Sequence, residues 1–286
     1  MSKIITISND ILKVSISTYK AELTSVIKNG KELIWQVDPD VWTEQCPILF
    51  PICGGLKDDK YLFDGKEYTL PKHGFARRSE FEVESVTDTK AVFRLRSNEE
   101  TLKNYPFEFE FRAFFQLDGE KLLTWYETKN LSSGSMFFSV GAHEGYSCPD
   151  GIEEYSVIFD TPENLKRNIL VGNLLENETE SLGLGEEVTE LPLKYEYFSV
   201  DALVFTNLKS RKVTLLNRNT KEEIKLEFPD HDYFLIWTKP NANYVCLEPW
   251  CGVPDFVGSS YDITQKRGII EIPAGGTDVR SHTITF

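Results

Sequence analysis

The sequence predicts an all-β protein built mainly from antiparallel strands. Three Asx-Gly pairs, Asn29-Gly30, Asp64-Gly65 and Asp118-Gly119, each separate two short strand-like runs, and this is the strongest short-range signal of a β-hairpin. Apolar and polar residues alternate in many of these runs, so that one face of each strand is dry and the other is wet. Helical periodicity is almost absent. Many short strands without a break favour one large β-sandwich.

The first half of the chain reads as a β-meander followed by further hairpins. The strands expected there are 4–7, 14–17, 23–28, 31–35, 60–63, 66–70, 81–85, 91–96, 107–117 and 121–128. In residues 107–111 phenylalanine alternates with glutamate, so we expect the aromatic rings to face a core and the carboxylates to face water.

The second half continues with strands. We expect them at 136–142, 155–159, 202–206, 213–217, 223–228, 233–238, 244–247, 268–272 and 282–286. A turn or two of helix is expected at 98–105, which Pro106 ends, and another at 162–166. Residues 173–190 are polar and rich in Glu, which favours a solvated excursion. Because no repeat or linker marks a boundary, we expect a single domain over residues 1–286.

Composition and charge exclude several classes of protein. The 286 residues fit one large β domain, and the formal net charge of -14 argues against nucleic acid or an anionic membrane as partner. Five scattered cysteines favour reduced, buried thiols in a cytoplasmic protein over a disulfide framework. No apolar run approaches about 18 residues and the N-terminus lacks an apolar h-region, so we expect neither membrane spanning nor secretion.

Glu248 is the first candidate for chemistry. It follows the apolar run 245–247 and precedes Pro249. Because Pro cannot donate a hydrogen bond to a sheet, we expect the strand to stop at Glu248 and leave the carboxylate half-buried near a rim. Apolar neighbours and Trp250 would disfavour the charged form, as in a general base. The alternative is a structural Glu that accepts hydrogen bonds from the backbone.

Two of the four histidines are placed to face a cleft. His73 and His143 lie at strand exits among Gly and small residues, whereas His231 reads as a turn residue and His282 as part of the last strand. Metal is a weak option, because His-x-His and His-Glu-x-x-His spacings are missing from the sequence. The sequence also contains neither a Gly-x-Ser-x-Gly elbow nor a phosphate-binding Gly-Lys-Ser or Gly-Lys-Thr motif.

Three aromatic residues are candidates for stacking on a sugar. They are Trp250, Phe75 and Tyr146, and each of them also reads as a core residue.

Several segments together carry a family resemblance. Pro-Ile-Leu-Phe-Pro at 47–51, His-Gly-Phe-Ala-Arg at 73–77, His143, Asp-Ala-Leu-Val-Phe at 201–205 and Leu-Glu-Pro-Trp at 247–250 occur in order. Over nearly the whole chain this resembles the aldose 1-epimerase (galactose mutarotase) family, especially its LacX-like branch. The resemblance implies a β-supersandwich with an open cleft on its concave face. It also implies a cofactor-free monomer or homodimer that binds a small sugar.

The resemblance also implies a mechanism. In the family a Glu removes the proton of the sugar O1 hydroxyl and a His donates one to the ring oxygen O5, so that the ring opens and recloses as the other anomer. By motif match, Glu248 would be the base and His143 the acid. His73 would hydrogen-bond the sugar near O5, Asp201 would hold ring hydroxyls, and Arg77 is a further candidate for substrate binding.

Two positions depart from the family pattern. The chain has Gly55 where the family commonly has an Arg, and Lys57 or Arg77 is expected to replace it. Glu144 follows His143 where Pro is frequent, and its charge would favour the imidazolium if the side chain points inward.

The expected activity is interconversion of the α and β anomers of an aldose, and three alternatives stay open. A hexose-6-phosphate 1-epimerase would need an added cationic pocket. A catalytically silent sugar-binding module would share the fold. A glycoside hydrolase would pair Glu248 with Asp201 or Asp255, but it would leave the two histidines unexplained.

Overall fold

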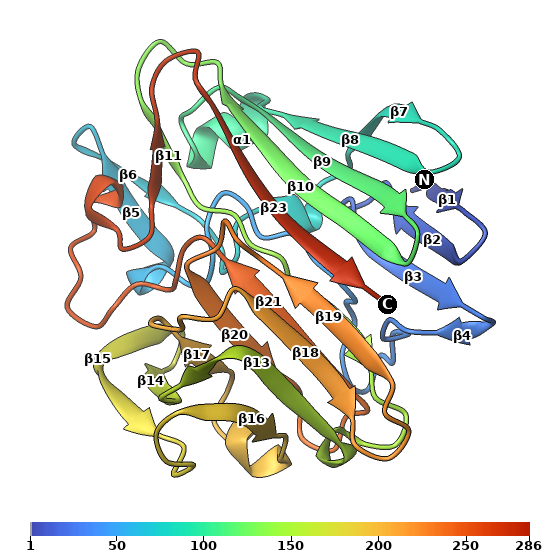
Figure 1. The fold of residues 1–286 in the computed structure, drawn as a ribbon. Helices are drawn as coiled ribbons and strands as arrows, with labels where there is room; N and C mark the ends of the chain where they lie inside the picture. The colour runs from blue at the N-terminus through green and yellow to red at the C-terminus, as the bar shows by residue number, and fades with distance from the viewer. Residues whose placement is uncertain (1) are drawn as a thin grey trace.

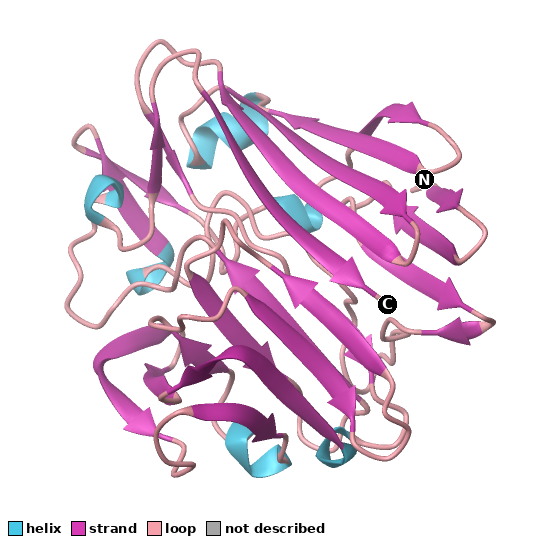
Figure 2. Ribbon diagram, viewed as in Figure 1, coloured by secondary structure: helices cyan, strands magenta, loops and turns pink. Residues whose placement is uncertain are grey.

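A computed structural model describes residues 2–286 of the protein, and strands dominate it (Figure 2). Within these residues, sheets of nine and six strands are accompanied by one four-stranded and two two-stranded sheets. Helix α1 (Glu99–Asn104) is capped by Asn98, whose side chain accepts from the backbone N–H groups of Glu100 and Thr101. The predicted all-β fold of mainly antiparallel strands is confirmed. The 3-10 turns are η1 (Lys57–Asp59), η2 (Ala76–Arg78), η3 (Ile152–Glu154), η4 (Tyr195–Phe198) and η5 (Ile263–Gln265).

The nine-stranded sheet joins the two halves of the chain. Figure 1 shows its long central strands side by side. In order across the sheet the strands are β16 (Val188–Pro192), β13 (Tyr155–Glu163), β18 (Lys212–Asn217), β19 (Glu223–Glu227), β23 (Thr277–Thr285), β10 (Lys121–Asn130), β9 (Phe109–Asp118), β8 (Lys90–Arg96) and β7 (Glu82–Val86). The C-terminal strand β23 pairs with β10 on one side and with β19 on the other.

The six-stranded sheet presents two different faces. Its strands in order are β12 (Glu144–Ser147), β21 (Tyr244–Trp250), β20 (Tyr233–Trp237), β17 (Leu203–Phe205), β14 (Lys166–Val171) and β15 (Leu174–Ser181). Leu247 and Phe205 point into the main core together with Phe111 of the nine-stranded sheet. Because successive side chains of a strand point to opposite faces, Glu248 and Val204 lie on the other face. That second face carries the candidate site.

The smaller sheets come mainly from the N-terminal part of the chain. Their strands are β1 (Ile4–Ser8), β2 (Leu12–Ser17), β3 (Leu23–Lys28) and β4 (Lys31–Glu32) in one sheet, β5 (Lys60–Phe63) and β6 (Lys66–Thr69) in the second, and β11 (Met136–Phe138) and β22 (Ile270–Ile272) in the third. At the β3–β4 turn Asn29 and Gly30 both have positive φ angles, 52° and 79°, which the predicted hairpin turn requires. In the β9–β10 hairpin Asp118 pairs with Lys121, so the turn residues are Gly119 and Glu120.

The prediction of a helical turn within residues 162–190 was wrong. The expected helical turn at 162–166 is extended, because β13 continues to Glu163, whose carboxylate accepts from the backbone N–H groups of Lys209 and Ser210 at 2.9 and 2.6 Å. The expected solvated excursion at 173–190 is largely exposed, but it also contains β15 and the start of β16. Leu175 is fully buried and anchors the start of this edge strand, whereas residues 177–181 at its far end are all exposed.

The prediction that the strand stops at Glu248 was also wrong. Strand β21 continues through Pro249 to Trp250. The Pro249 carbonyl accepts from the Ala142 N–H at 3.0 Å, but Pro249 has no N–H with which to complete that pair. The indole Nε1 of Trp250 donates instead to the Ala142 carbonyl at 3.1 Å, so no backbone acceptor is left without a donor at this point.

The five cysteines are free and buried, as predicted. Burial raises the pKa of all five thiols, that of Cys53 to about 12. A thiol that stays protonated is a poor nucleophile, so these side chains act as packing groups. No helix of residues 2–286 combines the length and the apolarity needed to cross a membrane.

Candidate active site

A cavity of about 260 Å³ lies on the face of the six-stranded sheet that is turned away from the main core. The fold brings all five predicted site residues to its wall from distant parts of the chain: His73, Arg77, His143, Asp201 and Glu248. The other residues around it are Trp42, Gly54, Lys72, Leu170, Asn173, Ala202, Val204, Leu235, Trp237, Trp250 and Pro254.

His143 and Glu248 form a buried pair. His143 Nε2 lies 3.3 Å from Glu248 Oε2, and the two side chains are only 11% and 2% exposed. The pairing of β12 with β21, with Glu144 opposite Leu247, places the residue before β12 beside Glu248. Glu248 is therefore more deeply buried than the half-buried position that the sequence predicts.

Burial acts on both members of this pair. It raises the pKa of Glu248 well above its ordinary value, an effect that the positive charge of Lys72 partly offsets. It lowers the pKa of His143 to about 3, and the nearby charge of Arg77 adds to this shift. A second proton is therefore hard to add to the His143–Glu248 pair, and the single proton that remains is hard to remove. Burial therefore favours a pair that carries one proton over a pair that carries two or none.

Aromatic rings fix the orientation of His143. The Trp42 ring stacks on it at a centroid distance of 5.4 Å, and Trp237 meets it edge-on at 5.7 Å. His143 Nδ1 is buried and finds no hydrogen-bond partner among residues 2–286. Packing, more than hydrogen bonding, therefore directs Nε2 toward Glu248.

His73 is held as a neutral ring. The ring Nδ1 of His73 accepts a hydrogen bond from the Gly54 backbone N–H at 3.1 Å. The backbone N–H of His73 donates to the Gly54 carbonyl at 2.8 Å. Burial lowers the pKa of His73 well below its ordinary value. With Nδ1 as acceptor, the ring proton lies on Nε2, which makes His73 an uncharged donor. Gly54 is needed here, because it has a φ of 75° and a Cβ would lie 2.3 Å from Pro254.

The charged groups of the cavity compensate one another. Lys72 Nζ lies 3.9 Å from an Asp201 oxygen. Arg77 forms an ion pair with Glu44 and donates to it from Nε at 3.3 Å. The cavity therefore offers polar donors and acceptors without an excess of positive charge.

The space at Gly55 is filled by Asn173. A Cβ at position 55 would lie 2.9 Å from Asn173 Cβ and 3.1 Å from its carbonyl oxygen. Asn173 itself lines the cavity. Of the two cations expected to replace the family Arg, Arg77 lines the cavity, whereas the Lys57 ammonium lies over the Tyr261 ring, 4.7 Å from its centroid.

Glu144 does not face the candidate site. Its Oε1 lies 2.9 Å from Nε2 of His282, and both side chains are buried. Adjacent residues of a strand point to opposite faces, so Glu144 enters the main core while His143 faces the cavity. The expectation that Glu144 favours an imidazolium at His143 is therefore not met.

One of the three aromatic candidates lies at the cavity. Trp250 lines it, with the His73 ring edge-on at 5.3 Å. Phe75 packs against Phe50 in the main core, where Tyr146 is also fully buried.

The sequence interpretation missed Trp42, Trp237 and Lys72. Lys72 carries one weak signal, its position next to His73. Trp42 lies in an aperiodic segment, and only the packing of distant segments places it against His143.

His143, Cys246 and Glu248 could together be read as a metal site. Their donor atoms lie within 4.8 Å of one another, and zinc uses all three donor types. Metal binding requires a thiolate, however, and burial raises the pKa of Cys246 well above its ordinary value. The three residues fit an acid–base pair beside a packed thiol better than a metal centre.

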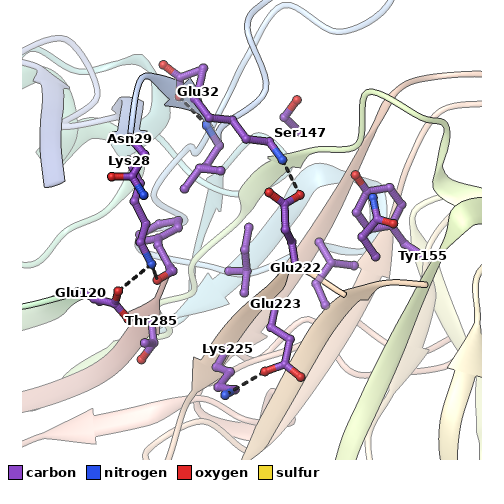
Figure 3. A pocket seen from close by; sticks show the side chains of 16 residues that line it. Lys28, Asn29, Glu32, Glu120, Ser147, Tyr155, Glu222, Glu223, Lys225 and Thr285 are labelled. Carbon is purple, nitrogen blue, oxygen red and sulfur yellow. Dashed lines mark hydrogen bonds and ion pairs between the residues drawn. The ribbon is translucent and has the colours of Figure 1, made fainter. Parts of the chain in front are cut away.

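A larger groove of about 550 Å³ lies among the β3–β4 turn, β18, β19 and the C-terminal strand (Figure 3). Its charged side chains pair with one another: Lys31 with Glu222, Lys28 with Glu120 at 2.9 Å, and Lys225 with Glu223 at 2.8 Å. The five predicted site residues lie elsewhere, so the smaller cavity is the better candidate for chemistry.

The chain is similar to known proteins over nearly its whole length. Residues 3–268 match the family model described as aldose 1-epimerase. The plasmid and chromosomal LacX proteins of Lactococcus lactis subsp. lactis are each 32% identical to this chain over 296 residues, covering 99% of both proteins.

Two solved structures share the whole fold. The galactose mutarotase related enzyme from Lactobacillus acidophilus has a TM-score of 0.93 at 33% identity, covering 99% of this chain and 97% of that chain. A galactose mutarotase-like protein from Lactobacillus casei ATCC 334 has a TM-score of 0.92 at 28% identity, covering 99% of both. The predicted galactose mutarotase-like supersandwich is thus confirmed, and the chain belongs to the aldose 1-epimerase family.

Proposed function

We propose that the protein interconverts the α and β anomers of an uncharged aldose, with His143 as general acid and Glu248 as general base. One observation carries the proposal: Nε2 of His143 and Oε2 of Glu248 lie 3.3 Å apart at the wall of one cavity. O1 and O5 of a pyranose are both bonded to C1. Two groups this close can therefore reach both oxygens of the same hemiacetal.

Ring opening requires two proton transfers in opposite directions. Glu248 takes the proton of the O1 hydroxyl, and the O1–H electrons form the C1=O1 carbonyl. The C1–O5 bond breaks with its electron pair on O5, which receives a proton from His143. Rotation about C1–C2 and the reverse transfers close the ring on the other face. The two transfers together leave the pair with one proton, as before the step, which is the state that burial favours.

The other residues of the cavity bind and orient the sugar. His73 donates from its neutral Nε2 near O5, and the Asp201 carboxylate accepts from ring hydroxyls. Arg77 supplies further donors while its charge is balanced by Glu44. The Trp250 ring offers an apolar surface to the C–H groups of the sugar. The whole set comes from one chain, so the proposal holds for a monomer or a homodimer.

The proposed reaction consists of proton transfers together with cleavage and reformation of the C1–O5 bond, so it calls for no cofactor. We place it in the cytoplasm, where the five free thiols would remain reduced.

The charge balance bears on the alternatives. A hexose 6-phosphate would need a cation free to pair with it, whereas Lys72 lies near Asp201 and Arg77 is paired with Glu44. A glycoside hydrolase would need a second carboxylate. Asp255 accepts a hydrogen bond from Lys266 Nζ at 2.8 Å and does not line the cavity. Of the two aspartates considered for that role, this leaves Asp201.

Substitution of the pair tests the proposal. Glu248→Gln keeps the size and one acceptor oxygen but cannot take a proton, so kcat for anomer exchange should fall by roughly 10²- to 10⁴-fold with little change in sugar binding. His143→Asn should behave similarly. Polarimetry and NMR exchange on glucose, galactose and glucose 6-phosphate, corrected for the buffer rate, measure the effect. If both variants exchange anomers as fast as the parent, the assigned acid and base are wrong. If the parent binds sugar without adding to the buffer rate, the protein is a binding module.

A further inference from the structure

A buried ion pair adjoins the loops that form one wall of the candidate site. Lys266 Nζ donates to Asp255 Oδ1 at 2.8 Å and to the Val253 carbonyl at 2.7 Å. The side chains of Lys266 and Asp255 are 3% and 7% exposed, and neither lines the cavity. Taking two charges out of water costs free energy that their attraction often fails to repay, so stability alone is a poor explanation for such a pair.

Asp255 ties together three segments that are distant in sequence. Its second carboxylate oxygen, Oδ2, accepts from the Lys57 backbone N–H at 2.9 Å, and its own backbone N–H donates to the Gly55 carbonyl at 2.9 Å. Its carbonyl accepts from the Leu175 N–H, also at 2.9 Å. Because Lys266 occupies Oδ1 while Lys57 occupies Oδ2, the carboxylate is held in one orientation.

The loop that Asp255 holds also carries the partner of His73. The Gly54 N–H donates to the ring Nδ1 of His73 at 3.1 Å. Gly54 packs closely on Pro254, the residue before Asp255, since a Cβ on Gly54 would lie 2.3 Å from the Pro254 side chain. The place of the Gly54 N–H therefore depends on the contact between these two loops.

We propose that Lys266 and Asp255 are positioning residues for His73, which act through the backbone of residues 54–57. The inference rests on the proposed function, in which the neutral Nε2–H of His73 donates to the sugar near O5. A shift of the loop by about 1 Å would stretch the bond from Gly54 to Nδ1 beyond the range of a hydrogen bond. The ring proton could then occupy either nitrogen, and the donor to the sugar would be lost in part of the molecules.

The tautomer of His73 can be measured without any turnover. In the parent labelled with ¹⁵N-histidine, NMR near neutral pH should show Nδ1 of His73 without a proton and Nε2 with one, with the signals assigned by comparison with His73→Gln. Lys266→Met removes the ammonium and leaves the Asp255 carboxylate buried without its cation. This variant should show the ring proton of His73 shared between the two nitrogens. A proton on Nδ1 in the parent would overturn the proposal.

Kinetics on glucose supply a second measurement. In Lys266→Met, KM should rise by about tenfold, because a displacement of about 1 Å in a binding group is costly. The value of kcat should stay within about threefold, because the His143–Glu248 pair is untouched. A purely structural role would instead lower the amount of active protein, and with it the apparent kcat, without changing KM.

Lys28→Met is the matched control. Like Lys266, Lys28 pairs with one carboxylate and donates to one backbone carbonyl, those of Glu120 at 2.9 Å and Phe286, but it lies in the larger groove (Figure 3). This variant should keep the parent's KM and the parent's His73 signals.

A double variant, Asp255→Asn with Lys266→Met, guards against loss of folding because it leaves neither charge buried alone. The amide oxygen can still accept from the Lys57 N–H, so KM should rise by only about threefold, with a tautomer mixture between those of the parent and Lys266→Met. The proposal is overturned if Lys266→Met, or the double variant where the single one does not fold, keeps the parent's tautomer and KM.

Two further outcomes are also decisive. If neither variant folds, the pair serves stability and the positioning role is rejected. If the parent exchanges no anomers, the proposed function fails, and the tautomer comparison still decides whether Lys266 and Asp255 position His73.

Discussion

At the residue scale, the proposed reactivity of the site would follow from burying two opposite kinds of titratable group in contact. An isolated buried carboxylate resists losing its proton, and an isolated buried imidazole resists gaining one. The contact of 3.3 Å between Glu248 and His143 allows one proton to serve both. The form with a carboxylate and an imidazolium and the form with two neutral groups then differ only in the position of that proton. The proposed ring opening needs this exchange.

The pH profile of anomer exchange should therefore be broad. The pKa of His143 is lowered to about 3, so the pair accepts a second proton only in acid. The pKa of Glu248 is raised, so loss of the last proton moves to higher pH. We expect kcat/KM, measured by polarimetry with the buffer rate subtracted, to stay nearly flat between pH 5 and 8. A narrow bell centred near the ordinary His pKa of about 6.5 would mean that the two groups titrate independently.

His231 is a second residue with a measurable consequence for pH. It is fully buried, and within residues 2–286 neither ring nitrogen has a hydrogen-bond partner. Burial lowers its pKa well below the ordinary value, with further contributions from His282, Arg280 and Arg211. In the native protein this side chain therefore stays neutral in mild acid, where an unfolded histidine binds a proton.

The free energy of unfolding should fall as the pH drops below about 6.5, the pKa of an unfolded histidine, because only the unfolded state then gains a proton at His231. The loss approaches about 1.4 kcal/mol per pH unit for one histidine. His231→Phe should remove one such contribution and flatten the curve between pH 6.5 and 5. Urea unfolding at several pH values measures how the free energy of unfolding depends on pH in the parent and in the variant. The difference between the two proteins at pH 8, where an unfolded histidine is neutral, isolates any change in packing. An unchanged slope would show that His231 is protonated in the native state.

At the element scale, short-range turn chemistry was predictable and long-range pairing was not. Asn29 and Gly30 adopt the positive φ angles that their identity favours, whatever surrounds them. The continuation of β21 through Pro249 depends on the Trp250 indole reaching the Ala142 carbonyl, which lies more than 100 residues away in sequence. Strand β15 was missed because an edge strand needs few apolar residues.

Asn173, in the turn between β14 and β15, can be used to test why position 55 is a glycine. Gly55→Ala should push Asn173 out of the cavity, destabilise the protein by about 1–3 kcal/mol and raise KM. Asn173→Gly alone should mainly weaken sugar binding. In the double variant the clash with Asn173 Cβ is absent and only the 3.1 Å contact with the backbone carbonyl oxygen remains. Thermal denaturation should therefore show that the double variant is more stable than the sum of the two single effects predicts, by about 0.5 kcal/mol or more. Additive effects would show that the two residues do not compete for the same space.

At the scale of the whole molecule, the sequence predicted the fold class and the motif-bearing residues of the candidate site. Period-two runs determine strands locally, and the motifs place His73, His143, Asp201 and Glu248 by resemblance. The rest of the cavity depends on packing among separate segments. Trp42 stacks on His143, and Asn173 fills the space beside Gly55, without any local pattern that announces either contact.

The order in which the chain enters the two large sheets predicts how the protein unfolds. The chain alternates between the two large sheets after β10, and β23 joins β10 to β19 in the centre of the nine-stranded sheet. Within residues 2–286 no single cut of the chain separates the nine-stranded sheet from the six-stranded sheet, so we propose that residues 1–286 unfold as one domain. At about 0.7 kcal/mol per residue the calorimetric enthalpy near 60 °C should be about 200 kcal/mol, and the van't Hoff enthalpy should equal it. Deleting residues 277–286 removes β23 and should abolish the folded state of both halves. Two resolved transitions, or a van't Hoff enthalpy near half the calorimetric one, would instead identify two domains.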